Sequence, residues 1–297
     1  MASVLEFEVK KEDEGRKLRD YLKTEIGLSS RLIRGSAVGG RIRIGNQIVK
    51  LNHSLEVGDI IRIELSKEES QDIEPEEMEL DIVYEDEDLL VVNKAPFTVV
   101  HPTRSHPSGT LANGVLHHFR SRGESCIVRL VSRLDRDTSG LIIIAKNQYC
   151  HMFLAKEMER NAVIKGYTAV VWGNLKKSKG TINEPIYRPS QDSIKRVVDP
   201  RGQKSITHFE VVESFNQADL VRLRLETGRT HQIRVHLSYL GNPIIGDTLY
   251  GREEETLINR QALHASHLTF LHPRTKETIS LSSDLPEDIK NLIRSFK

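Results

Sequence analysis

The stretch Ser132–Asn147, SRLDRDTSGLIIIAKN, places a charged loop directly before an apolar run. Leu141–Ala145 shows no alternation of polar and apolar residues, which indicates a strand covered on both faces. The loop before it carries Asp135 and Asp137 and ends in Gly140, which permits a tight entry of the backbone into the strand. A loop attached to a central strand is held rigidly, so a carboxylate in it is well placed for chemistry. The alternative is an Asx-type turn with solvated charges.

Strand-rich sequence surrounds this stretch from Leu80 to the C-terminus. Runs of β-branched and apolar residues bounded by turn residues predict strands within 81–94, 140–146, 165–173, 205–215 and 220–228. Apolar periodicity predicts helices at 111–121, 148–160 and 230–241. Strands and helices do not alternate strictly. The fold class predicted for this region is therefore α+β, with a mixed, largely antiparallel sheet and flanking helices.

A basic segment precedes that region. From Gly15 to Lys50 there are nine Lys and Arg residues against two acidic ones, a net charge of about +7. Two short helices are predicted here, at 16–27 and 30–38, and in the second Arg31 and Arg34 share a face. Glu68 to Asp88 contains many acids and no Lys or Arg. This order predicts a polyanion-binding module followed by a linker, with an ordinary solvated helix face as the alternative.

These features predict two domains. A small α+β domain covers 1–72, an acidic linker runs to about 79, and a larger domain covers 80–297. Cys126 and Cys150 cannot form a disulfide framework and lack metal-ligand spacing, so a reducing, cytoplasmic setting is expected. No run approaches the roughly 18 apolar residues of a membrane span, and the first residues lack the apolar core of a secretion signal. We expect no membrane partner.

A second charged stretch, LRLETGRTHQIRVHL, can supply a cation for a carboxylate of the first stretch. A strand is predicted to end at 226–228, and Thr230 is a candidate cap for the helix that follows. Arg229 lies in the tight turn, from which a guanidinium can reach into a cleft and pair with a carboxylate. His231 and His236 are five residues apart, whereas a helical zinc pair needs four. They are expected to be capping, core or RNA-facing residues, and no metal is implied.

Together these stretches resemble a known family. RLDRDTSGLIIIAK, KGYTAVVWG, LETGRTHQIRVHLSYLGNPIIGDTLYG and LHASHLTFLHP, in that order, are similar to the RluA family of pseudouridine synthases and, within it, to the RluD type. In the first 65 residues, GRKLRDYL, SSRLIR and VKLNHSLEVGDIIRI resemble the small RNA-binding domain that carries the α-L motif. The usual G.V.VNG of that domain is here GGRIRIGNQ.

The resemblance implies roles for individual residues. Asp135 matches the catalytic aspartate, and Arg229 matches the arginine paired with it. Tyr167 matches the tyrosine that stacks on the target base, and Arg133 matches the arginine that enters the RNA helix as the base leaves. Asp137 is expected to be structural. Basic residues of the N-terminal domain are expected to bind the RNA, foremost among them Arg16, Arg31 and Arg34.

Two motifs depart from the family pattern. Ser132 stands where a His usually precedes RLD, and the NKP.G..VHP motif reads NKAPFTVVHP, with Pro96 displaced and Phe97 near the expected Gly. The lip of the cleft is therefore expected to differ.

The implied reaction is the isomerisation of uridine to pseudouridine in structured RNA, with large-subunit ribosomal RNA as the expected target and transfer RNA as an alternative. It breaks and remakes the bond between base and sugar, so neither metal nor cofactor is implied. The oligomeric state is not predicted. Two rival functions are a non-catalytic RNA-binding or ribosome-assembly factor on the same fold, and a glycosidase that uses Asp135 and Asp137 as acid and base.

Overall fold

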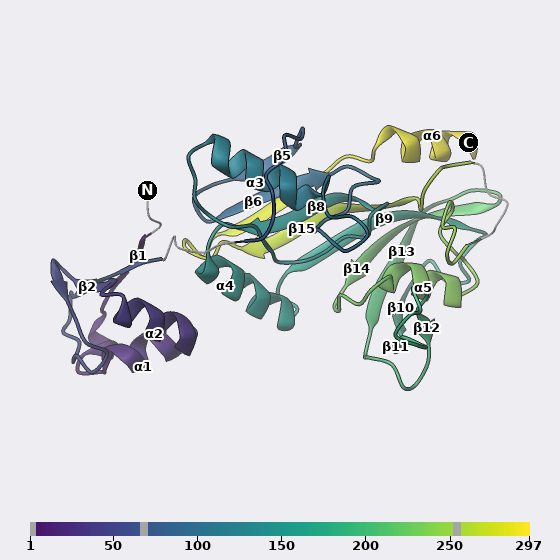
Figure 1. The fold of residues 1–297 in the computed structure, drawn as a ribbon. Coiled ribbons are helices and arrows are strands. Elements are labelled where there is room, and N and C mark those ends of the chain that lie inside the picture. Colours follow the sequence, from purple (N-terminus) through teal and green to yellow (C-terminus); the bar gives the residue numbers. More distant parts are fainter. Residues whose placement is uncertain (1–3, 66–70, 252–256) are drawn as a thin grey trace.

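The computed structural model describes residues 4–65, 71–251 and 257–297 (Figure 1). The first part is a small unit of four strands and two α-helices. Its elements are β1 (Val4–Glu8), a 3-10 helix (Lys11–Asp13), α1 (Leu18–Thr24), α2 (Ser30–Val38), β2 (Ile42–Ile44), β3 (Gln47–Ile48) and β4 (Ile60–Glu64). The strands form an antiparallel sheet in the order β1-β4-β2-β3.

The rest of the chain is built around a ten-stranded sheet. Its helices are α3 (Leu111–Ser121), α4 (Gln148–Glu159), α5 (Gln232–Tyr239) and α6 (Glu287–Ser295). Its strands are β5 (Ile82–Glu85), β6 (Leu89–Lys94), β7 (Arg129–Leu130), β8 (Ser139–Ala145), β9 (Ile164–Trp172), β10 (Lys179–Asn183), β13 (Ile206–Ser214), β14 (Ala218–Leu225), β15 (Leu263–Leu271) and β16 (Thr278–Ser282). A separate hairpin pairs β11 (Ile186–Tyr187) with β12 (Val197–Val198).

The sheet order is β10-β13-β14-β9-β15-β8-β6-β5, with β16 beside β15 and β7 beside β8. Only the β8–β15 pair is parallel among the described strands, and the other pairs are antiparallel. This mixed, largely antiparallel sheet with a few helices confirms the predicted α+β class. Strand β15 was not predicted, because histidines interrupt its apolar run.

Strand β8 is buried along its whole length, as the absence of alternation predicts. Ile142 and Ile144 pack with α3 in one hydrophobic cluster. Leu141 and Ile143 pack with Cys150 and other apolar residues of α4 in another. Helices therefore cover both faces of the sheet at β8, and the loop before this strand is anchored in the core.

The N-terminal unit has its own hydrophobic core, centred on Leu18, Leu22 and Ile61. It lies at one end of the elongated molecule, next to α4 (Figure 1). Tyr149 of α4 belongs to the same cluster, and the Arg274 guanidinium donates to the carbonyl oxygen of Val4. Apolar packing and a hydrogen bond thus attach the unit to the rest of the chain.

The acidic segment expected as a linker packs against the larger unit where it is described. Residues 66–70 lie outside the described residues. From Gln71 onward the chain is held: the Gln71 side chain exchanges hydrogen bonds with the backbone of Val128, Ile73 is buried in the main core, and the Glu74 carbonyl accepts from Asn113. Among the described residues that follow residue 70, contacts with the larger unit begin at Gln71, one residue before the predicted domain boundary at residue 72. That boundary stays a prediction. No described helix is long and apolar enough to cross a membrane.

Candidate active site

The loop that carries Asp135 is held by two buried basic residues. Lys94 Nζ donates to the carbonyl oxygen of Arg136 at 2.9 Å, and Arg260 Nη1 donates to that of Asp137 at 3.1 Å. Both basic residues are at most 2% exposed, and burial lowers the pKa of Lys94 to about 7. Buried donors thus hold the carbonyl oxygens of both central residues of the turn. This is the rigid support that the apolar strand predicts.

Asp135 pairs with an arginine from far along the chain. Arg234 Nη1 donates to Asp135 Oδ2 at 3.0 Å, while its Nε and Nη2 hold Asp247 Oδ2 and Oδ1 at 2.7 and 2.8 Å. The Asp247 side chain is fully buried, and 27% of the Asp135 side chain is exposed. Burial lowers the pKa of Arg234, but its bonds to Asp247 and Asp135 outweigh burial and raise that pKa above its ordinary value. Arg234 therefore remains a cation that orients the more exposed carboxylate.

The pairing expected between Arg229 and Asp135 is wrong. Arg229 is exposed, and its Nε donates to the carbonyl oxygen of Lys204 at 3.3 Å. Arg229 lies in the turn before α5, whereas Arg234 lies on the helix itself and faces the core. A signal was present in the sequence, because an arginine between Ile233 and Val235 in an amphipathic helix is a buried cation that needs an acid.

The start of α5 also differs from its prediction. The helix begins at Gln232 rather than near Thr230, and His231 precedes it with a φ of 57°, in the left-handed region. The Gln232 amide fastens the turn: Oε1 accepts from Thr227 Oγ1 and from the Arg229 amide, and Nε2 donates to the Ile206 carbonyl. A side-chain amide within the helix thus replaces a hydroxyl cap.

Tyr167 lies in β9, and its side chain belongs to the main hydrophobic core while remaining 9% exposed. Burial raises the pKa of its phenol, and the nearby Asp135 carboxylate raises it further. The Tyr167 phenol is therefore neutral and lies near the Asp135 carboxylate. The structure brings Asp135, Tyr167 and Arg234 together, and leaves Arg229 at the surface.

The two histidines of this motif have different surroundings. His236 is buried, with Nδ1 at 2.9 Å from Thr207 Oγ1 and Nε2 at 3.0 Å from the Glu184 carbonyl oxygen, so it is a core residue as expected. His231 lies in the site, with Nε2 at 3.9 Å from Asp135 Oδ2. The sequence alone did not separate these roles.

The other residues singled out in the sequence lie on the surface. Arg133 is exposed and has no hydrogen-bond or ion-pair partner among the described residues. Asp137 accepts from the side chain of its neighbour Arg136 at 2.7 Å, and the structural role expected of it stays a prediction. In the N-terminal unit Arg31 and Arg34 are both exposed on α2.

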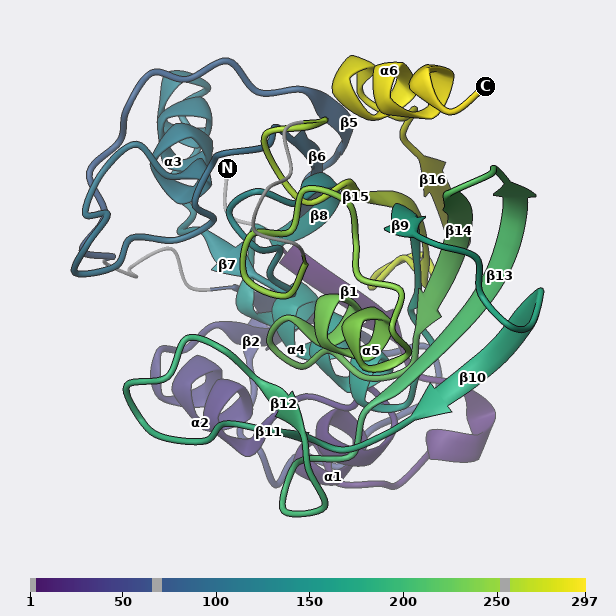
Figure 2. The same ribbon diagram turned by 90° about the vertical axis from the view of Figure 1, so that its right-hand side faces the viewer.

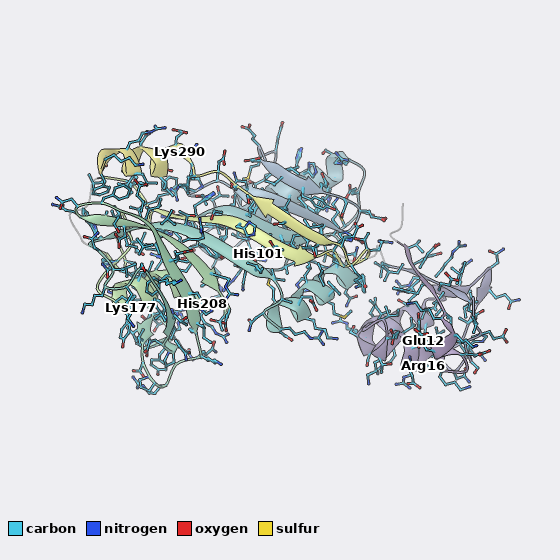
Figure 3. The ribbon with its side chains drawn as sticks, turned by 180° about the vertical axis from the view of Figure 1, so that it is seen from behind. Glu12, Arg16, His101, Lys177, His208 and Lys290 are labelled. Atoms are coloured by element: carbon cyan, nitrogen blue, oxygen red, sulfur yellow. The ribbon has the colours of Figure 1, made fainter. Side chains whose placement is uncertain are left out.

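Arg16 is less available than the two arginines of α2. Its guanidinium pairs with Asp13, lies 3.7 Å from a Glu25 carboxylate oxygen, and stands over the Tyr21 ring. Its neighbour Glu12 is exposed on the same unit (Figure 3). Part of the positive charge expected of this segment is therefore neutralised within the unit.

The NKAPF departure also has a structural counterpart. Lys94 Nζ donates to the Ala95 and Thr98 carbonyl oxygens as well as to the Asp135 loop. Phe97 has a φ of 62°, a conformation that favours glycine, and is 56% exposed. Phe97 thus adopts a left-handed conformation at the place where the sequence departs from the family motif. No group of three or more His, Cys, Asp or Glu residues in the described part of the chain could hold a metal ion.

Comparison with known proteins shows the family of this chain. A family model described as RNA pseudouridylate synthase matches residues 88–239, which include Asp135, Tyr167 and Arg234. The chain is 43% identical, over 91% of its length and 96% of the relative's, to the uncharacterized RNA pseudouridine synthase YjbO of Bacillus subtilis. It belongs to the RluA family of RNA pseudouridine synthases. Its enzyme class is therefore isomerase.

Further relatives extend the similarity. The ribosomal large subunit pseudouridine synthase D of Yersinia pestis is 37% identical over 85% of this chain and 82% of that protein. Among solved structures, human RNA pseudouridylate synthase domain containing 1 is similar with a TM-score of 0.58 and 27% identity, covering 73% of this chain and 94% of that one. The similarity thus extends to a solved structure that shares the fold.

Proposed function

We propose that Asp135 is the catalytic group of this pseudouridine synthase and that its substrate is large-subunit ribosomal RNA. The observation that carries the catalytic part is the 3.0 Å bond from Arg234 Nη1 to Asp135 Oδ2 beside the buried phenol of Tyr167. An oriented carboxylate next to an aromatic ring suits a flipped base whose bond to the sugar must be cleaved. The reaction breaks the N1–C1′ and C5–H bonds, forms the C5–C1′ bond and returns a proton to N1, so the composition is unchanged.

Asp135 acts on the sugar or on the base. A carboxylate stabilises positive charge that develops at C1′, as it does in glycoside cleavage. Arg234 keeps one oxygen of the carboxylate occupied, so the other, Oδ1, is the atom directed at the substrate. Among the described residues no hydrogen bond to Oδ1 competes for it.

Tyr167 and Arg133 serve the extrusion of the target nucleotide. Flipping a base out of a helix costs a few kcal/mol, and stacking on an aromatic ring returns about 1–3 kcal/mol per base. Tyr167 offers its ring beside Asp135. Arg133 is two residues away and exposed, which suits a side chain that fills the gap left in the RNA.

The N-terminal unit binds the surrounding RNA in this proposal. Arg31 and Arg34 project from α2, and the segment 15–50 is strongly basic. Phosphate contacts from such a unit raise affinity without reading sequence. The similarity to several bacterial proteins named ribosomal large subunit pseudouridine synthase D supports ribosomal RNA as the target. We propose the cytoplasm as the place of action.

The test is to map pseudouridines in ribosomal and transfer RNA from cells with and without this gene. Loss of one or more sites in large-subunit ribosomal RNA, restored by the intact gene and not by an Asp135→Asn version, is the expected result. Sites lost only from transfer RNA would refute the ribosomal target. Restoration by Asp135→Asn would refute the role of Asp135.

A further inference from the structure

A second chain of contacts leads to Oδ2 of Asp135, the oxygen to which Arg234 donates. Tyr250, in the segment that follows Asp247, is 6% exposed, and its hydroxyl lies 2.9 Å from His231 Nδ1. The two rings meet edge to face with centroids 5.6 Å apart. The other ring nitrogen of His231, Nε2, lies 3.9 Å from Asp135 Oδ2, the oxygen that Arg234 holds.

The tautomer of His231 follows from the partners of Tyr250. The backbone N–H of Arg196 donates to the Tyr250 hydroxyl oxygen at 2.8 Å. The phenol still has its own hydrogen to donate, and His231 Nδ1 is the acceptor within reach. Burial lowers the pKa of His231, so its ring is neutral near neutral pH and carries one hydrogen. If Nδ1 accepts, that hydrogen is on Nε2, the nitrogen that faces Asp135.

The backbone at His231 has an unusual conformation. His231 has a φ of 57° immediately before α5, a left-handed conformation that costs a non-glycine residue free energy. Only 13% of its side chain is exposed. In this conformation the His231 ring lies between the Tyr250 hydroxyl and the Asp135 carboxylate.

We propose that Tyr250 and His231 form a positioning pair that directs an Nε2–H donor at Oδ2 of Asp135 and so leaves Oδ1 as the reactive oxygen. The inference rests on the proposed catalytic role of Asp135. The distance of 3.9 Å exceeds a hydrogen bond, and such contacts commonly tighten when substrate is bound. Arg234 and His231 then hold one carboxylate oxygen from two directions.

The pair also connects the site with the hairpin of β11 and β12. Arg196 adjoins β12, and Lys195 Nζ lies 5.6 Å from the centre of the Tyr250 ring. Figure 2 shows this hairpin beside α5. Val235 of α5 packs with Ile186 and Tyr250 in a small apolar cluster. The hydroxyl of Tyr250 therefore links Arg196, next to the hairpin, with His231, immediately before α5.

Two substitutions of His231 distinguish the contributions of its two ring nitrogens. An Asn amide occupies the place of Nδ1 and tolerates the left-handed backbone, but cannot reach Asp135. A Gln amide reaches the place of Nε2. We expect His231→Asn to lower kcat about 10- to 100-fold with KM almost unchanged, and His231→Gln to recover most of that loss. Tyr250→Phe, which removes only the hydroxyl, is expected to behave like His231→Asn.

The assay follows release of tritium from C5 of uridine in large-subunit ribosomal RNA taken from cells that lack the gene. The intact full-length protein, the three variants, the double variant His231→Asn/Tyr250→Phe and Asp135→Asn are compared by initial rates over a range of RNA concentrations, which give kcat and KM. Because the pair acts as one unit, the double variant is expected to lose no more than His231→Asn alone. Thermal melting of each variant reports whether it is folded.

Each contrary result has a distinct meaning. Full kcat in a folded His231→Asn, a loss confined to KM, or losses that multiply in the double variant would overturn the positioning pair. Turnover by Asp135→Asn would instead overturn the proposed function. An inactive Asp135→Asn with an unaffected His231→Asn leaves the proposed function standing and removes only this inference.

Discussion

Gly140 approaches Ala265 so closely that a Cβ on Gly140 would lie 2.3 Å from the Ala265 carbonyl oxygen. These residues pair in the parallel contact between β8 and β15, and Gly140 has a φ of 115°. Both features require glycine. We expect Gly140→Ala to lower the free energy of unfolding by about 3 kcal/mol or more. The atoms that an added Cβ would meet are backbone atoms of Ala265, which cannot move aside as the end of a flexible side chain can. Urea denaturation followed by circular dichroism measures the change.

Gly123→Ala is the matched control for Gly140→Ala. Gly123 follows α3 with a φ of 71°, but an added Cβ would meet nothing within 4 Å. Only the backbone cost remains, which is about 1 kcal/mol. Equal losses in both variants would mean that the close approach of β8 to β15 contributes nothing beyond the backbone conformation.

Arg234 and Arg229 provide a direct test of which arginine serves Asp135. Lys in place of Arg234 keeps the charge but loses the fork that holds Asp247 and Asp135 together. We expect Arg234→Lys to lower kcat roughly 100-fold, because the carboxylate loses its orientation. Arg229→Gln changes an exposed side chain and is expected to stay within about twofold of the intact enzyme. Initial rates at saturating RNA give kcat for both variants. A larger loss in Arg229→Gln than in Arg234→Lys would show that Arg229 serves Asp135.

Arg234 pairs with Asp135 where Arg229 was predicted to do so. The difference shows which features the sequence can predict and which it cannot. The buried strand β8, the carboxylate loop before it and helices α3 and α4 could be predicted, because each depends on a local pattern of apolar residues. The arginine that pairs with Asp135, 99 residues further along the chain, was predicted wrongly, although an arginine between apolar residues of α5 was a signal for it. Its choice depends on where α5 begins, and Gln232 sets that start through contacts with distant backbone.

Other parts of the fold were missed for a related reason. The parallel pairing of β8 with β15 joins segments that no local pattern connects. The hairpin of β11 and β12 was not predicted, because each of its strands is only two residues long. Tyr250 lies between these elements, so its part in the site could be recognised only after they were placed in space.

His264 makes stability depend on pH below neutrality. It is 1% exposed on β15, with Nδ1 at 2.9 Å from Ser139 Oγ, and burial lowers its pKa to about 4. Between the ordinary value of about 6.5 and this value the unfolded chain binds more protons than the folded chain, so stability falls as pH falls. The loss is on the order of 3 kcal/mol and is complete near pH 4.

His264→Asn is expected to remove this contribution. The Asn amide can replace the bond to Ser139 but has no proton to gain. Urea denaturation of both proteins at a series of pH values between about 7 and 4 gives the difference in slope. Parallel curves for the two proteins would show that His264 titrates alike in the folded and unfolded chains.

Arg31 and Arg34 on α2 are predicted to contact RNA phosphates. Each contact contributes roughly 0.7–0.9 to the slope of log affinity against log salt, so Arg31→Gln/Arg34→Gln should reduce that slope by roughly 1.4–1.8. The control is Lys176→Gln/Lys177→Gln, which removes the same charge from exposed residues at the opposite end of the molecule (Figure 3). Filter binding to large-subunit ribosomal RNA over a range of salt concentrations measures both. If the two double variants lose the same slope, the effect reflects net charge, and the N-terminal unit has no special part in binding.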